Sequence, residues 1–398
     1  MGDVSSADGI RIGVVGCGVV GAAIAYELSQ IPGLTVTVLD RRFPEAWEAT
    51  GAALGVLMGA ISQKQRGNKL QMRLASLQRY ETLVPELETL NGWEVPFNRE
   101  GILQLCFDQT ELSQWKTTVE IRHSQGFQLE ILDPAEVAVR YPEVSVARHL
   151  QIGQQLVGAI YSPQDRQIDP VALTQALIEA AQRHGAIFQF QTVVQGFVRT
   201  SRQEGWQVTE IQTDKSKFPV DWLVLASGLG STSLTADLEQ EINIQPVLGQ
   251  ALHLRRRQPL MQPRPVIYGG SVHLVPLNST ELWAGATVEF PVEEKLNFSS
   301  VVEAAKQKIR PDPAKLKALM QQAIALDPNL AEATVIRTWS GLRPRPQNRP
   351  APVLGPLPSY TNVLLATGHY RNGILLAPAT AQKVRELITA SEGFCAKA

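Results

Sequence analysis

The sequence predicts an α/β chain in which two domains interleave, one of them assembled from separate segments. Three observations lead to this prediction. A strand, a glycine turn, a helix and a second strand follow one another between residues 10 and 40. Two later apolar runs, residues 222–228 and 363–368, look like buried strands that end in glycine turns, and residues 272–287 fit an antiparallel hairpin. We therefore expect a Rossmann-like domain with an inserted antiparallel-sheet domain, an α+β arrangement of two domains.

The first unit carries a glycine motif in the context that dinucleotide binding requires. Gly16 permits a tight turn, Gly18 lets a pyrophosphate approach the backbone, and Gly21 lets the helix pack on the sheet. The second strand ends on Asp40, whose carboxylate can accept hydrogen bonds from a ribose diol. The start of the helix offers free N–H groups to phosphate. The alternative is a tight turn in another α/β fold.

Later segments continue the α/β pattern and set the domain boundaries. Asp169 and Pro170 are typical of a helix start, the helix extends to about His184, and Gly185 ends it. Residues 101–105 and 272–287 indicate a less regular sheet. We assign residues 1–90, 141–235 and 336–398 to the dinucleotide-binding domain, and residues 91–140 and 236–335 to the substrate-binding domain.

Composition excludes several classes of protein. The 37 basic and 38 acidic side chains nearly cancel, so nothing attracts the chain as a whole to nucleic acid or to anionic membranes. No apolar run approaches the roughly 18 residues of a membrane span. Three cysteines without metal-ligand spacing indicate a reducing compartment and no metal site. We expect a cytoplasmic protein without a secretory signal.

Residues 369–376 favour FAD over NAD, a choice on which the glycine motif alone is silent. They follow a buried strand and open a helix that continues to Leu387. The positive end of that helix would stabilise the negative charge of a reduced flavin around N1 and the C2 carbonyl. An ordinary strand–helix turn is the alternative. The sequence has no second glycine fingerprint, which favours electrons arriving directly from a bound substrate.

Arg343 is the side chain that points most directly to a substrate. It lies in an apolar, stiff segment, residues 339–344, where a guanidinium keeps its charge and needs a partner. A substrate carboxylate bound by two hydrogen bonds is one such partner, and a structural ion pair is the other. Arg345 and Arg349 fall in a stretch rich in proline and arginine that we expect to be a solvated loop.

Several motifs together resemble the D-amino-acid oxidase superfamily of flavoproteins, most closely glycine oxidase, over nearly the whole chain. Its most specific motif is the tail, residues 368–380, Gly-His-Tyr-Arg-Asn-Gly-Ile-Leu-Leu-Ala-Pro-Ala-Thr. The other matching segments are residues 16–21, 49–56, 164–170, 226–228, 248–250 and 285–287. The resemblance implies FAD bound without a covalent link, since no cysteine lies near the tail motif and Cys395 follows the last helix.

The resemblance also assigns roles to residues. Arg343 would hold the substrate carboxylate, Arg371 would line the substrate site, and Val194 would touch adenine. The predicted cofactor contacts are Gly16, Gly18, Val19, Val20, Gly21, Asp40, Arg41, Thr50, Leu54, Gly55, Val56, Val194, Ala226, Gly228, His369, Tyr370, Arg371, Asn372, Gly373, Ile374 and Leu375.

Three positions depart from the glycine oxidase pattern. His273 stands where glycine oxidases have a tyrosine near the substrate, Leu277 replaces an arginine, and Gly51 replaces a serine. These changes bear on the substrate more than on the cofactor. We predict a pocket role for His273, with a strand histidine bonded to a backbone carbonyl as the alternative.

The predicted function is FAD-dependent oxidative deamination of a small amino acid or amine, such as glycine, sarcosine or D-alanine. A hydride passes to the flavin, the imine hydrolyses to an oxo acid and ammonia, and oxygen or another acceptor takes the electrons. The alternatives are a D-amino-acid dehydrogenase that uses a quinone or carrier, an NAD-dependent dehydrogenase, and a non-catalytic flavoprotein assembly module. The resemblance further implies a link to thiazole synthesis for thiamine. The sequence leaves a homo-oligomer open.

Overall fold

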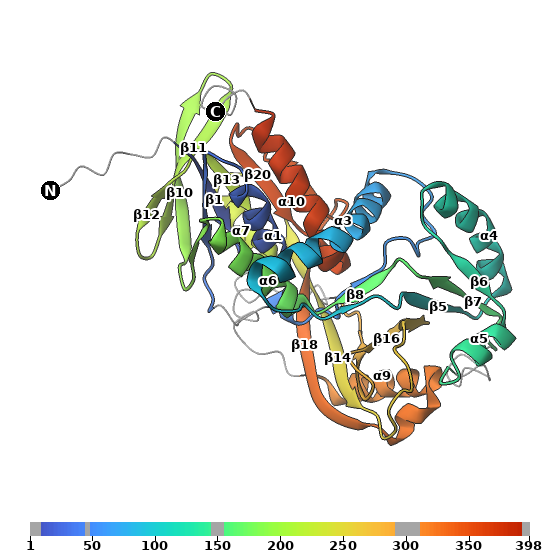
Figure 1. Cartoon of the computed structure of the whole chain (residues 1–398). Coiled ribbons are helices and arrows are strands. Elements are labelled where there is room, and N and C mark those ends of the chain that lie inside the picture. The colour runs from blue at the N-terminus through green and yellow to red at the C-terminus, as the bar shows by residue number, and fades with distance from the viewer. Residues whose placement is uncertain (1–8, 44–47, 145–154, 291–310, 392–398) are drawn as a thin grey trace.

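A computed structural model of the chain describes residues 9–43, 48–144, 155–290 and 311–391 (Figure 1). Its first large sheet has six strands in the order β19-β20-β13-β1-β2-β9. All neighbours are parallel except β19 and β20. The strands are β1 (Ile10–Val15), β2 (Leu34–Leu39), β9 (Ile187–Gln189), β13 (Trp222–Leu225), β19 (Val353–Pro356) and β20 (Val363–Thr367).

Two different layers cover this sheet. Helices α1 (Val19–Ser29), α3 (Asn68–Asn91), α6 (Pro170–Arg183) and α10 (Gly373–Thr389) pack together, and α1 contacts both β1 and β2. A three-stranded sheet, β10 (Val194–Arg202), β11 (Gly205–Thr213) and β12 (Lys217–Pro219), packs on the other side through a separate apolar core. The Asp169 carboxylate caps α6 by accepting from the N–H groups of Val171 and Ala172, as the sequence predicts.

The second large sheet has eight strands in the order β18-β14-β17-β16-β15-β5-β7-β6. It is antiparallel apart from the pair β5 and β15. The predicted hairpin is present as β16 and β17. The strands are β5 (Ile102–Cys106), β6 (Glu130–Leu132), β7 (Gly158–Ser162), β14 (Ile244–Arg255), β15 (Val266–Gly269), β16 (Val272–Pro276), β17 (Glu281–Gly285) and β18 (Thr334–Pro346).

Helices and short elements complete the two domains. The long strands β14 and β18 extend from the region of the six-stranded sheet toward α9 (Figure 1), and α9 packs on β14, β16 and β17. A third, small sheet has the order β3-β8-β4. The remaining elements are α2 (Glu48–Gly51), β3 (Val56–Leu57), β4 (Phe97–Asn98), α4 (Gln109–Ser124), α5 (Pro134–Arg140), β8 (Arg166–Ile168), η1 (Gly228–Gly230), α7 (Ser231–Asp237), α9 (Pro313–Leu326), η3 (Pro328–Glu332) and η4 (Tyr370–Asn372).

The predicted fold class is confirmed, and two strands join a different sheet from the one that the predicted boundaries imply. β7 pairs with β5 and β6, although residues 141–235 were assigned to the dinucleotide-binding domain. β18 pairs with β14 along most of its length, although that domain was predicted to resume at residue 336. An apolar run indicates a buried strand without indicating its partner, because pairing depends on residues far away in the sequence. The boundaries themselves stay a prediction.

Candidate functional site

A cavity of about 960 Å³ lies between the six-stranded sheet and the eight-stranded sheet. All but two of the predicted site residues line it. They are Gly16, Gly18, Val19, Val20, Asp40, Arg41, Thr50, Leu54, Gly55, Val56, Val194, Ala226, Gly228, His273, Arg343, His369, Tyr370, Arg371, Asn372, Gly373 and Ile374. The structure therefore gathers segments from both ends of the chain around one space, large enough for a nucleotide cofactor and a small substrate.

Gly21 and Leu375 do not line the cavity. A Cβ atom added to Gly21 would lie 1.9 Å from the carbonyl oxygen of Gly16, so this glycine serves the close packing of α1 on the turn. The side chain of Leu375 is 2% exposed and belongs to the core among the helices. Both residues pack behind the residues that line the cavity, whereas the sequence prediction had placed them in contact with the cofactor.

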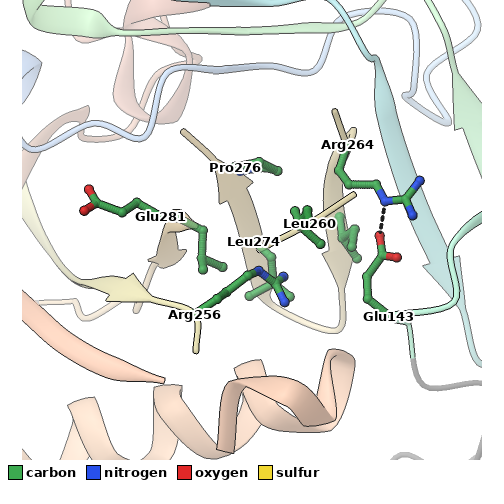
Figure 2. Close-up of a pocket in the computed structure, with 9 residues that line it drawn as sticks. Glu143, Arg256, Leu260, Arg264, Leu274, Pro276 and Glu281 are labelled. Atoms are coloured by element: carbon green, nitrogen blue, oxygen red, sulfur yellow. Dashed lines mark ion pairs between the residues drawn. The ribbon is translucent and has the colours of Figure 1, made fainter. Parts of the chain in front are cut away.

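A second cavity has a volume of about 10 Å³, room for about one water molecule. Figure 2 shows the residues that line it. Arg264 and Glu143 form an ion pair of 2.8 Å beside it, and none of the predicted site residues lines it. Among the described residues, none of the helices has both the length and the apolar character needed to span a membrane. No group of three or more His, Cys, Asp or Glu in the same residues is placed to hold a metal ion.

The glycine turn presents the start of α1 to the large cavity. Gly16 has a φ of +103°, a conformation that L side chains rarely adopt. Gly18 is the N-cap residue and has no side chain that could cap the helix. The N–H of Val19 donates to the Thr50 hydroxyl at 3.1 Å, and the N–H groups that follow it in the first turn remain open to a ligand. This arrangement suits the binding of phosphate.

Asp40 lines the cavity at the end of β2, as predicted, but its carboxylate already has partners. It accepts from the backbone N–H of Cys17 at 2.7 Å and forms an ion pair with Arg42 at 3.1 Å. The residue is 6% exposed. The ion pair with Arg42 orients the carboxylate, and Arg42, which also lines the cavity, was missed by the sequence prediction.

The tail motif delivers the start of a second helix to the cavity. β20 ends before Gly368, which has a φ of +64°, and α10 begins at Gly373. Asn372 provides no side-chain cap to α10, so the positive end of the helix dipole is open toward the cavity, as predicted. Behind it, Nε2 of His369 lies 3.0 Å from the Thr380 hydroxyl, and burial lowers the pKa of His369 to about 4.

Arg343 extends from β18 into the cavity without a carboxylate partner in the described part of the chain. One of its terminal nitrogens donates to the carbonyl oxygens of Leu248 at 3.3 Å and Thr287 at 3.1 Å. Burial, and then the charge of Arg371, lower the pKa of Arg343. The carboxylate of Glu289 also acts on Arg343 but forms an ion pair with Lys315. The structural ion pair considered for Arg343 is therefore not formed among the described residues.

A glycine on the neighbouring strand makes room for this guanidinium. Gly249 of β14 pairs with Gly341 of β18, and a Cβ atom at Gly249 would lie 2.3 Å from both terminal nitrogens of Arg343. Arg345, predicted in a solvated loop, belongs to β18 and lies over the rings of Phe290 and Tyr370.

His273 lies on β16 and faces the same cavity. Its ring stacks on Tyr268, with 4.4 Å between centroids, and Nε2 is 3.3 Å from the sulfur of Met58. Burial, and then the charge of Arg371, lower the pKa of His273 to about 4, so the imidazole is neutral at pH 7. Leu277 and Gly51, the other two departures from the glycine oxidase pattern, do not line the cavity.

We expect the protein to lose stability as the pH falls from the ordinary histidine value of 6.5 toward 4. His273 and His369 take up protons near 6.5 in the unfolded chain and only near 4 in the folded chain. The unfolded state binds more protons in this window, so the free energy of unfolding falls by about 1.4 kcal/mol per pH unit for each histidine. Urea unfolding near neutral pH and near pH 5 measures the loss. His369→Gln should lose less stability than the unchanged protein, and equal losses would contradict the assignment.

Other lining residues carry no motif that could have indicated them. They include Met58, Tyr268 and three cations, Lys64, Lys69 and Arg73. No cysteine of the described residues lines the cavity, and Cys395 lies outside them.

Comparison with known proteins decides the family. The profile of the family described as "FAD dependent oxidoreductase" matches residues 11–387. The chain belongs to the FAD-dependent oxidoreductase family. Its cofactor is FAD, and the open helix starts, the glycine turn and the size of the cavity all fit this group.

Members of the FAD-dependent oxidoreductase family similar to this chain include glycine oxidases. The bifunctional protein ThiO/ThiG of Synechocystis sp. is 33% identical to this chain. The matched region covers 94% of this chain and 51% of that relative. The glycine oxidase of Geobacillus kaustophilus is 27% identical over 96% of this chain and 93% of its own. A crystal structure of that enzyme superposes with a TM-score of 0.80, covering 96% of each chain. This chain thus spans about half the length of the first relatives it matches.

Proposed function

We propose that the protein oxidises a small amino acid or amine, such as glycine, sarcosine or D-alanine, by hydride transfer to FAD. One observation carries the proposal: Arg343 is a partly buried guanidinium that faces the cofactor cavity, and its hydrogen-bond partners among the described residues are carbonyl oxygens. A charge buried in this way is stabilised by an anion, and an amino acid brings a carboxylate. The similar glycine oxidases support the same choice.

In this proposal the side chains bind and orient, and the cofactor carries the redox chemistry. FAD supplies the hydride acceptor when it is bound. Arg343 holds the substrate carboxylate by two hydrogen bonds, and Arg371 adds a second positive charge to the same end of the cavity. Fixing the carboxylate limits the positions that the α-carbon can take, and such positioning accelerates the reaction.

His273 contributes a neutral imidazole to the substrate end. Because its pKa lies near 4, it adds no charge beside the two arginines at pH 7. The substrate amine reacts in its neutral form, and the imine that leaves hydrolyses in water to an oxo acid and ammonia. No side chain is needed as a strong base in this scheme.

Anaerobic reduction of the flavin tests the proposal. Glycine, sarcosine and D-alanine are each added to the holoprotein without oxygen, and the visible absorbance of the flavin is recorded. We expect at least one of them to bleach it, with lactate as a control that has the carboxylate but no amine. If no amine bleaches the flavin, the proposal fails, and a non-catalytic flavoprotein assembly module becomes the better interpretation of the protein.

The electron acceptor, the pathway and the location belong to the same proposal. Peroxide formation on admitting oxygen would favour an oxidase, and dye reduction without peroxide would favour a D-amino-acid dehydrogenase that uses a quinone or carrier. The resemblance to ThiO/ThiG supports a role in thiamine synthesis. The chain belongs to an FAD-dependent family, so the alternative of an NAD-dependent dehydrogenase is dropped. The cytoplasmic location and the homo-oligomer stay predictions.

A further inference from the structure

Three cations that the proposed function does not use line the same cavity as Arg343 and Arg371. They are Lys64, in the loop before α3, and Lys69 and Arg73, in the first two turns of α3. We call these three residues the α3 cluster. None of them forms an ion pair with a described carboxylate, although eighteen such pairs occur elsewhere in the described chain.

The α3 cluster is continuous with the substrate end of the cavity. Nη2 of Arg73 donates to Oδ1 of Asn372 at 3.2 Å, and Asn372 follows Arg371 directly. The charge of Arg371 in turn acts on both Arg343 and His273. Within the cluster, burial and then the charges of Arg73 and Lys64 lower the pKa of Lys69. The contact of Arg73 with Asn372 therefore connects the α3 cluster to the tail motif that carries Arg371.

The acids of the described residues that line the cavity do not balance these positive charges. They are Asp40 and Glu48, which pair with Arg41 and Arg42 beside the glycine turn. Asp165 acts on the pKa of Arg73, but its buried carboxylate accepts from the backbone N–H groups of Gly59, Ala60 and Ile61. The pyrophosphate of FAD is expected at the glycine turn, where the N–H groups at the start of α1 can bind it.

Arg73 carries a further sign of a missing partner. The residue is partly buried, and among the described residues its terminal nitrogens donate to the neutral oxygens of Ser62 and Asn372. A partly buried guanidinium that meets only neutral acceptors is stabilised by an anion. A substrate with a single carboxylate, bound to Arg343, would leave the positive charges of the α3 cluster without an anion.

We propose that Arg73, Lys69 and Lys64 form a second anion subsite, so that the preferred substrate carries another carboxylate beyond the one held by Arg343. The substrate class is an acidic amino acid or an N-carboxymethyl amine. This inference rests on the proposed function, because it takes the Arg343 end of the cavity as the place where an amino acid binds. The competing assignment is that these cations stabilise negative charge on the flavin itself.

Matched substrates test the subsite, since each pair differs by one carboxylate. D-aspartate is compared with D-alanine, and iminodiacetate with sarcosine, by kcat/KM on the holoenzyme. We expect the diacid to be preferred in at least one pair. Arg73→Gln combined with Lys69→Gln should reduce the diacid-to-monoacid ratio by about tenfold or more, the loss typical of a charged hydrogen bond. Arg66→Gln is the control, because Arg66 is exposed in the same loop and does not line the cavity.

Binding of unreactive acids separates the subsite from the proposed function. Succinate and acetate are titrated into the holoprotein, and the flavin spectrum reports binding. Tighter binding of succinate that depends on Arg73 supports the subsite, even if no amine is oxidised and the proposed function fails. Oxidation of sarcosine without any preference for diacids, in turnover or in binding, overturns the subsite and leaves the proposed function standing. If the Arg73→Gln, Lys69→Gln variant loses the same factor in kcat/KM for both members of each pair and its flavin spectrum changes, the subsite is overturned. The cations are then assigned to stabilising negative charge on the flavin.

Discussion

Replacing Arg343 by alanine is expected to lower kcat/KM for a small amino acid by about 10²- to 10³-fold, the cost of removing one partner of a buried charged pair. The loss should fall mainly on KM, because the guanidinium binds the carboxylate and does not react. FAD should stay bound, because Arg343 hydrogen bonds to the carbonyls of Leu248 and Thr287 and not to the glycine turn. Steady-state kinetics and the flavin content of the purified variant measure both parts.

Two further variants make the Arg343 result specific. Arg343→Lys keeps the positive charge but loses the bidentate hydrogen bonding of a guanidinium, so it should recover only part of the activity that Arg343→Ala loses. Arg349→Ala removes an exposed arginine from the loop after the same strand and should have little effect. An unchanged KM for every amino acid tested in Arg343→Ala would remove this residue from substrate binding. Arg371 is more exposed, so Arg371→Ala should cost less.

The parts of the site that could be predicted are those that a short segment defines by itself. The glycine turn and the tail helix each combine a buried strand, a glycine with positive φ and an uncapped helix start within about a dozen residues. Arg343 could be predicted because a guanidinium in a stiff apolar segment needs a partner wherever the segment packs. For these features the local sequence determines most of the local geometry.

The parts that could not be predicted depend on how distant elements pack. Lys69 and Arg73 look like ordinary charges near the start of an amphipathic helix, and only the packing of α3 on α10 brings them to the tail motif. The places of β7 and β18 in the larger sheet likewise depend on distant partners, since β7 pairs with β5 more than 50 residues earlier and β18 pairs with β14 about 90 residues earlier.

Gly249→Ala is expected to raise KM for the amino acid by about 10²-fold without a change in the arginine itself, since a misplacement near 1 Å costs that much. The new methyl group would lie 2.3 Å from the terminal nitrogens of Arg343. The backbone of β14 is held on both sides by β17 and β18, so the flexible guanidinium has to move. Stability should change little, because the clash involves the end of a long side chain. Kinetics and urea unfolding of the same preparation measure the two effects.

Gly196→Ala provides the matched control for this substitution. Gly196 also lies in a strand, β10, and a Cβ atom there would have its closest contact at 3.5 Å, an ordinary van der Waals distance. If Gly249→Ala acts through Arg343, combining it with Arg343→Ala should be no worse than Arg343→Ala alone, because the two changes remove the same interaction. Additive losses in the double variant would show that Gly249 affects the site by another route. A loss of stability equal to the loss of activity would show that the strand moves instead of the guanidinium.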